Sequence, residues 1–225
     1  MWRCPAAVHD GIRQQSHERE TMKIGILGAG AIGTAVATRL AAGGHQVVLS
    51  NSRGPDTLAS VVGKLGSGVS AGTRDEAAQA ELVVLAVPGD RTTEALAGLP
   101  GWDGRVLVDA TNDYAGSSSG PEGETSSEAV ARRAPGARVV KAFNHLFAAT
   151  LAADPRRPEG NRVLFVSGDD DDAKKMFTGL LTELGFAPID LGGLADGGRL
   201  HQVPGGPLLG QDLVRLTPAE QQTRQ

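Results

Sequence analysis

Apolar residues gather along this chain in short, nearly continuous runs, separated by longer stretches of mixed composition. Short runs rich in Val, Ile and Leu are typical of strands that are buried on both faces of a parallel sheet. Such runs predict strands at Ile24–Leu27, His45–Leu49, near Val69, Leu82–Val87, Val106–Asp109, Arg138–Lys141, Val163–Val166 and Ala187–Asp190.

The stretches between these runs repeat their apolar residues at helical spacing. They predict helices from Gly33 to Gly43 and at Pro55–Leu65, Arg74–Ala80, Arg91–Leu99, Thr125–Arg133, Phe143–Leu151 and Asp170–Leu184. Because strand and helix alternate, we expect an α/β fold: a single Rossmann-type doubly wound parallel sheet with helices on both faces and no separate C-terminal helical domain.

The remaining segments are polar and predict loops or ends. Residues 1–21 lack the apolar core of a signal peptide, and we expect a disordered N-terminal extension before a Rossmann domain at 22–200. Residues 201–225 are expected to form a C-terminal loop segment and a frayed tail. Ala115–Glu124 is rich in Gly and Ser and predicts a mobile loop; lid and linker both fit it, and linker is the simpler interpretation. Arg156–Asn161 predicts a polar loop.

Composition narrows the class of partner. The chain has 225 residues and a net charge of −4, which gives no reason to expect nucleic acid or an anionic membrane as partner. Cys4 is the only cysteine, so no intrachain disulfide is expected and a cytoplasmic location is the default. No apolar run approaches the ~20 residues of a membrane span.

Three glycines mark the first turn between a strand and a helix, as Gly28-x-Gly30-x-x-Gly33. A turn of this kind brings an anionic group to a helix N-terminus, where free backbone N–H groups and the helix dipole favour negative charge. The pattern alone is weak evidence, but here it follows a predicted strand and opens a predicted helix that leads to a second strand. We therefore expect a dinucleotide site.

The residues that follow the second strand indicate which dinucleotide. Enzymes that use NAD usually carry Asp or Glu there, whereas this chain reads Ser50-Asn51-Ser52-Arg53 and has no carboxylate before Asp56. A hydroxyl and a guanidinium suit a 2′-phosphate, so we expect NADP(H) rather than NAD(H). The alternative is that Arg53 is an ordinary solvated surface arginine.

Two further patterns suggest other chemistry but are disfavoured. Gly68-Val-Ser70-Ala-Gly72 matches a hydrolase nucleophile elbow, with Asp109 and His145 following in hydrolase order, yet no firm strand precedes it. Asp169–Asp172 resembles a calcium cluster but lacks alternating acidic spacing, and capping of a helix N-terminus explains it. There is no Cys/His ligand set, and we expect no metal.

Several stretches together resemble the F-420:NADPH oxidoreductase family and are also similar to the cytosolic domain of the six-transmembrane metalloreductases. They occur in family order from Lys23 to about Arg199: GILGAGAIGTAVA, VVLSNSRGP, VVLAVP, LVDATN, VVKAFNHL, VSGDDDDAKK and LGFAPIDLGGL. The resemblance implies a Rossmann domain that binds NADP(H), usually in a homodimer, and passes hydride between nicotinamide and a deazaflavin. Arg199–Leu213 departs from the relatives because it is short and rich in Gly and Pro.

The resemblance also assigns site residues. It implies that the pyrophosphate is held by Gly28, Gly30, Ala31, Ile32 and Gly33. It assigns the 2′-phosphate to Ser52 and Arg53 beside Asn51, and the ribose side to Val87 and Pro88. The nicotinamide would be bordered by Asn112 and Ala142–His145. Hydride transfer between planar rings needs orientation more than acid–base groups, so Asn144 and His145 are the candidates near the reacting rings. Alternatively, Asn144 caps a helix and His145 is structural.

We therefore predict an NADP(H)-dependent oxidoreductase whose partner is a small-molecule hydride donor or acceptor, either coenzyme F-420 or a flavin. The alternative is a non-catalytic NADP(H)-binding redox sensor or partner protein, because no substrate domain is apparent in the sequence.

Overall fold

A computed structural model describes residues 21–114, 121 and 123–217. The expected N-terminal extension up to residue 20, most of the glycine- and serine-rich loop at 115–124 and the tail after 217 lie outside the described residues. In the part that is described, no helix combines the length and the apolar character needed to cross a membrane.

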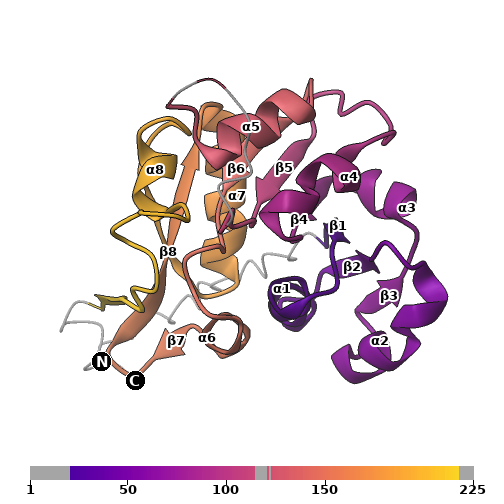
Figure 1. Cartoon of the computed structure of the whole chain (residues 1–225). Helices are drawn as coiled ribbons and strands as arrows, with labels where there is room; N and C mark the ends of the chain where they lie inside the picture. Colours follow the sequence, from indigo (N-terminus) through magenta and orange to yellow (C-terminus); the bar gives the residue numbers. More distant parts are fainter. Residues whose placement is uncertain (1–20, 115–120, 122, 218–225) are drawn as a thin grey trace, which may run out of the picture.

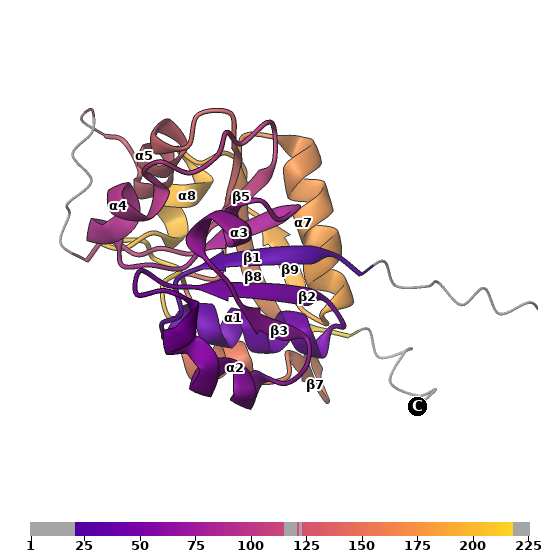
Figure 2. The same ribbon diagram turned by 90° about the vertical axis from the view of Figure 1, so that its right-hand side faces the viewer.

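The strands of the described residues form one sheet through the middle of the molecule (Figures 1 and 2). They are β1 (Lys23–Leu27), β2 (Gln46–Ser50), β3 (Val69–Ala71), β4 (Leu82–Leu85), β5 (Val106–Asp109), β6 (Arg138–Lys141), β7 (Arg156–Arg157), β8 (Gly160–Gly168), β9 (Ala187–Asp190) and β10 (Val214–Leu216). The order is β10-β8-β6-β5-β4-β1-β2-β3, and β7 and β9 also pair with β8. The pairs from β3 through β6 are parallel, which confirms the expected Rossmann-like α/β fold.

Helices cover both faces of the sheet because successive strand residues point to opposite sides. They are α1 (Ala31–Ala42), α2 (Ala59–Leu65), α3 (Arg74–Ala78), α4 (Thr92–Leu96), α5 (Ser126–Arg133), α6 (Ala148–Ala152), α7 (Asp171–Glu183) and α8 (Gly197–His201), with short 3-10 turns at Pro55–Leu58 and Gly89–Arg91. Ile24 and Ile26 belong to the core that α1 and α7 cover, whereas Leu27 belongs to the core under α3, α4 and α5.

Close packing explains one residue that propensity would not place in a strand. Gly25 lies in the middle of β1, where a Cβ atom would stand 1.8 Å from the carbonyl oxygen of Ala77. The backbone of α3 therefore rests directly on β1. The N-terminus of this helix is fixed by Thr73 and Glu76, whose side chains each accept a hydrogen bond from the other's backbone N–H.

The helix predicted at Phe143–Leu151 is wrong at its start, since α6 begins only at Ala148. Phe143 has a left-handed backbone (φ 65°), and its ring packs edge-on against Phe177 of α7, 5.6 Å between centroids. Asn144 and His145 follow as buried residues of a turn, so a tertiary contact replaces the first helical turn.

The polar loop predicted at Arg156–Asn161 is also wrong, because this segment forms the hairpin of β7 and the start of β8. The hairpin reverses the chain, so β8 runs antiparallel to β6 instead of parallel as the alternation of elements suggested. Lys141, the last residue of β6, is paired with Ser167, which leaves the preceding residues of β8 extending beyond the end of β6. The C-terminal segment likewise contains a strand, β10, which pairs with this extension.

Candidate cofactor-binding site

Two of the three fingerprint glycines are required by the packing of the protein itself. Gly28 has φ +117°, and a Cβ atom there would lie 2.3 Å from the carbonyl oxygen of Ala86. A Cβ atom on Gly33 would lie 1.9 Å from the carbonyl oxygen of Gly28. These contacts hold the turn against the end of β4 and press the first turn of α1 onto the glycine loop.

Gly30 differs, because a Cβ atom on it would meet no protein atom within 4 Å. It is the N-cap of α1, no side chain caps this helix, and its first turn carries no acidic residue. The first N–H groups of a helix need acceptors, and here nothing from a side chain supplies one. The space beside Gly30 therefore fits an anionic group such as a pyrophosphate.

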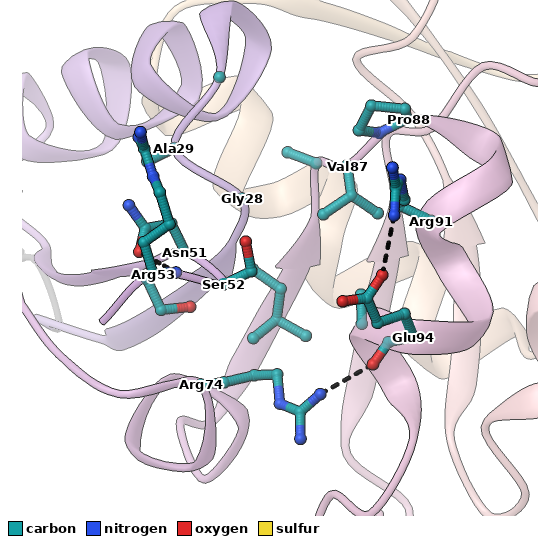
Figure 3. Close-up of a pocket in the computed structure, with 15 residues that line it drawn as sticks. Gly28, Ala29, Asn51, Ser52, Arg53, Arg74, Val87, Pro88, Arg91 and Glu94 are labelled. Atoms are coloured by element: carbon teal, nitrogen blue, oxygen red, sulfur yellow. Dashed lines mark hydrogen bonds and ion pairs between the residues drawn. The ribbon is translucent and has the colours of Figure 1, made fainter. Parts of the chain in front are cut away.

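This space opens into a pocket of about 860 Å³ at the carboxyl ends of β1, β2 and β4 (Figure 3). Its lining brings together the end of β1, the loop after β2 and the segment from β4 into α4. The residues are Leu27, Gly28, Ala29, Gly30, Ser50, Asn51, Ser52, Arg53, Arg74, Ala86, Val87, Pro88, Arg91, Glu94 and Ala95. Seven of the residues that the sequence predicted for the cofactor thus line one pocket: Gly28, Gly30, Asn51, Ser52, Arg53, Val87 and Pro88.

The loop after β2 is shaped by Asn51. Its Oδ1 accepts a hydrogen bond from the backbone N–H of Arg53 (3.0 Å), and its Nδ2 donates to Oγ1 of Thr57 (2.9 Å). Ser50 is buried and donates its hydroxyl to the carbonyl oxygen of Ile26, so it serves the fold. Ser52 and Arg53 are exposed and remain the groups of this loop that are available to a ligand.

Two arginines and a glutamate on the other walls of the pocket were not identified from the sequence. Arg74 begins α3 and donates from Nη1 to the carbonyl oxygen of Glu94 (2.8 Å), while Arg91 forms an ion pair with the carboxylate of Glu94 (3.2 Å; Figure 3). With Arg53, the pocket carries three guanidinium groups and one carboxylate. The only signal in the sequence was that Arg74 and Arg91 follow the ends of strands on the same edge of the sheet.

The remaining predicted residues divide between the helix and the adjacent strands. Ala31 is exposed and Ile32 half-buried in the first turn of α1, and Ala142, Asn144 and His145 are buried after β6. Asn112, after β5, donates from Nδ2 to the carbonyl oxygen of Asn144 (2.9 Å) and accepts at Oδ1 from Nδ2 of Asn144 (3.1 Å). The two asparagines form a reciprocal amide bridge, and Asn144 also donates to the carbonyl oxygen of His201.

The amide bridge adjoins the pocket. The backbone N–H of Gly89, next to Pro88, donates to the carbonyl oxygen of Asn112 (3.1 Å). A Cβ atom on Gly89 would lie 2.7 Å from Cα of Asp113, so the two loops are in direct contact. The structure thus places Asn112 and Asn144 beyond Pro88 along the same edge of the sheet. Asn144 is not a helix cap, because the N-cap of α6 is Phe147.

A buried charge pair joins the ends of β5 and β6, the two strands that lead to the asparagines. Lys141 at the end of β6 lies 3.4 Å from Oδ2 of Asp109 at the end of β5, and both side chains are fully buried. Asp109 also accepts hydrogen bonds from the backbone N–H and hydroxyl of Thr111 and from the hydroxyl of Ser127. These bonds fix the chain just before Asn112.

Two histidines are buried beside the bridge and are held neutral. Burial lowers the pKa of His145 to about 4, and the backbone of Val163 and the carboxylate of Asp212 oppose this only in part. Burial, with the nearby charge of Lys141, lowers the pKa of His201 to about 3. The His145 ring packs on Phe165 with 4.7 Å between centroids, and His201 Nε2 lies 2.9 Å from the hydroxyl of Ser167.

The alternative sites are not assembled. Ser70 lies within β3 at one edge of the sheet and donates its hydroxyl to the carbonyl oxygen of Val47, whereas Asp109 and His145 follow strands on the other side of β1. Asp170 is the N-cap of α7 and accepts from the N–H of Ala173 (2.7 Å), which confirms the capping interpretation. Within the described residues, no group of three or more His, Cys, Asp or Glu is arranged to hold a metal ion.

Comparison with known proteins identifies the family of the chain. Residues 23–113 match the family model described as NADP oxidoreductase, coenzyme F420-dependent. The metalloreductase STEAP3 of Rattus norvegicus is 31% identical over 83% of this chain, but the chain spans only 37% of that protein. The chain therefore corresponds to about a third of the curated metalloreductases it matches.

Two solved structures match over nearly their whole length. A hypothetical protein from Sinorhizobium meliloti is 43% identical with a TM-score of 0.80, over 87% of this chain and 96% of the other. A protein from Arthrobacter sp. FB24, provisionally assigned as an F420-dependent NADP reductase, is 31% identical with a TM-score of 0.60, over 77% of this chain and 86% of the other. The chain therefore belongs to the family of coenzyme F420-dependent NADP oxidoreductases.

Proposed function

We propose that this protein passes hydride between the nicotinamide of NADP(H) and a flavin or deazaflavin such as coenzyme F420. The observation that carries the proposal is the open, uncapped helix end at Gly30, which shares one pocket with Ser52 and Arg53. Gly30 supplies room for a pyrophosphate, and the loop after β2 supplies groups for a 2′-phosphate. The family to which the chain belongs supports the same cofactor.

The charges of the pocket favour NADP(H) over NAD(H). The lining contains three arginines, Arg53, Arg74 and Arg91, but one carboxylate, Glu94, which is paired with Arg91. A 2′-phosphate adds negative charge and acceptor oxygens that a guanidinium binds in a bidentate manner. An acidic residue at the end of β2 would repel this phosphate, and Ser52 and Arg53 occupy that place instead.

The reacting end of the site is proposed at the Asn112–Asn144 bridge. Two large aromatic side chains, Tyr114 and Phe147, follow these asparagines and are 78% and 76% exposed. Exposed aromatic residues provide flat surfaces for a second ring system. A bound nicotinamide supplies a hydride, that is two electrons and a proton, and the acceptor takes one further proton from water. The residues of this chain bind and orient, and no acid–base residue is required.

The test mixes the purified protein and NADPH with F420, FAD or FMN and follows the absorbance of the nicotinamide. We expect NADPH oxidation with at least one acceptor, and no oxidation with any of them would favour a non-catalytic NADP(H)-binding protein. Gly30→Ala is the matched binding-deficient variant, because its methyl group enters the open space and meets no protein atom. It should lose NADPH binding while the unfolding free energy changes by about 1 kcal/mol at most, as Ala is a poorer N-cap than Gly.

A further inference from the structure

Arg74 occupies a distinctive place at one end of the pocket. It projects from the start of α3 toward α4, where Nη1 donates to the carbonyl oxygen of Glu94 (2.8 Å; Figure 3). The capping hydrogen bonds between Thr73 and Glu76 fix the helix from which it comes. The side chain is half-buried and lines the pocket, with one guanidinium nitrogen anchored on α4.

Among the residues that the structure describes, no carboxylate neutralises the charge of Arg74. Glu94 is the carboxylate of the pocket, but its Oε2 is engaged by Arg91 (3.2 Å) and only its main-chain oxygen meets Arg74. Within the described ranges, Arg74 takes part in no ion pair with a carboxylate. One of its donors is bound, and the face of the guanidinium is available to a ligand.

The chemistry of the lining indicates what that ligand group is. None of the residues that line the pocket is aromatic, so an adenine ring would find no Phe, Tyr or Trp to stack on. The flat groups available are the three guanidiniums, of which Arg91 is paired with Glu94 and Arg53 stands in the loop assigned to the 2′-phosphate. Guanidinium planes stack on aromatic rings and gain cation–π attraction.

We propose that Arg74 stacks on the adenine of the bound dinucleotide and thereby contributes affinity that does not depend on the 2′-phosphate. This inference rests on the proposed NADP(H) occupancy of the pocket. It divides the work between two arginines: Arg53 discriminates NADP(H) from NAD(H), and Arg74 binds the adenosine half that both share. Loss of the Arg74 side chain should weaken both ligands about 2- to 30-fold, the range that cation–π contacts give.

Isothermal titration calorimetry with 2′,5′-ADP and 5′-ADP tests this without any hydride acceptor. Arg74→Ala should weaken both ligands by the same factor, whereas Arg53→Ala should weaken 2′,5′-ADP far more than 5′-ADP. Arg74→Lys keeps the charge but loses the plane, and it should recover less than half of the lost affinity in logarithmic terms. Arg157→Ala, which removes an exposed arginine of β7, controls for the change in net charge and should alter neither affinity.

The outcomes separate the two proposals. Unchanged affinity in Arg74→Ala overturns the inference, and a loss confined to 2′,5′-ADP overturns it as well, because Arg74 would then be a phosphate ligand. If the wild-type protein binds neither ligand, the proposed function fails first. Thermal melting of each variant shows that the fold is kept, and Arg74→Gln provides a second variant that retains a donor for the Glu94 carbonyl.

Discussion

The buried histidines make the stability of this protein depend on pH in a way that the structure specifies. Burial lowers the pKa of His145 to about 4 and of His201 to about 3, compared with 6.5 in the unfolded chain. Between pH 6.5 and these folded-state pKa values, the two histidines are therefore protonated in the unfolded chain but neutral in the folded protein. Their contribution to the unfolding free energy is fully present above pH 6.5 and is lost as the pH falls toward the folded-state pKa values.

The size of the effect follows from these values. Between pH 8 and pH 5, each histidine costs about 2 kcal/mol of unfolding free energy, so the pair costs about 4 kcal/mol. Burial also lowers the pKa of His45, although Glu183 opposes this, and His45 adds to the loss in the same direction. A loss of this size is a large part of the stability of a typical domain.

Urea unfolding at pH 8, 7, 6 and 5 measures the loss, with the fluorescence of buried Trp102 as the signal. His145→Phe is the informative variant, because neither ring nitrogen makes a hydrogen bond of normal geometry within the described residues and the ring already packs on Phe165. We expect this variant to lose about 2 kcal/mol less than wild type between pH 8 and pH 5.

Because carboxylates titrate alike in both proteins, the difference between them isolates His145. An identical pH dependence in wild type and His145→Phe would refute the assignment of a depressed pKa to His145. A wild-type stability that stays flat from pH 8 to pH 5 would refute the reasoning for both histidines.

Three further substitutions test other parts of the structure by chemical denaturation. Gly33→Ala should lower the unfolding free energy by about 3 kcal/mol or more, because its Cβ atom would lie 1.9 Å from the Gly28 carbonyl oxygen. A loss under 1 kcal/mol would show that the turn is not tightly packed. Lys141→Met should lower the unfolding free energy by about 3–5 kcal/mol, because it leaves the buried carboxylate of Asp109 without its cation. Arg91→Met removes one partner of an exposed ion pair and should lower it by about 1 kcal/mol at most. Equal losses in the two variants would contradict this account. Thr125→Ala removes the capping box of α5 and should cost about 1–2 kcal/mol, and no measurable change would mean that Glu128 alone holds the helix end.

Much of the sheet was predictable because its central strands are buried on both faces and therefore consist mainly of apolar residues, with charged residues only at strand ends. β4 and β5 are completely buried, and their runs were visible in the sequence. The hairpin of β7 and β8 was missed because Arg156 and Arg157 are exposed at an edge, where no apolar pattern is required. The start of α6 was missed because the Phe143–Phe177 contact overrides the helical spacing.

The candidate site was predictable to the extent that strand ends and glycine turns define it. Gly28, Gly30 and Arg53 were found because the fingerprint and the second strand lie close together in sequence. The three glycines looked equivalent, and only the structure shows that Gly30 faces open space whereas Gly28 and Gly33 face protein. Arg74 was missed because its place in the pocket depends on its reaching α4, and local sequence carries no sign of that contact.

The reversal of β8 has a mechanical consequence. From Gly160 to Val166 this strand continues past the last residue of β6, a length of about 20 Å, and β9 and β10 are hydrogen-bonded to it there. The strand beside the amide bridge therefore belongs to the same sheet as β1, which leads into the cofactor fingerprint (Figure 1). Within the described residues, rotation of one half of the molecule against the other would have to break the pairing of β6 with β8. We expect adjustment around a bound ring to come from side chains rather than from movement of the sheet.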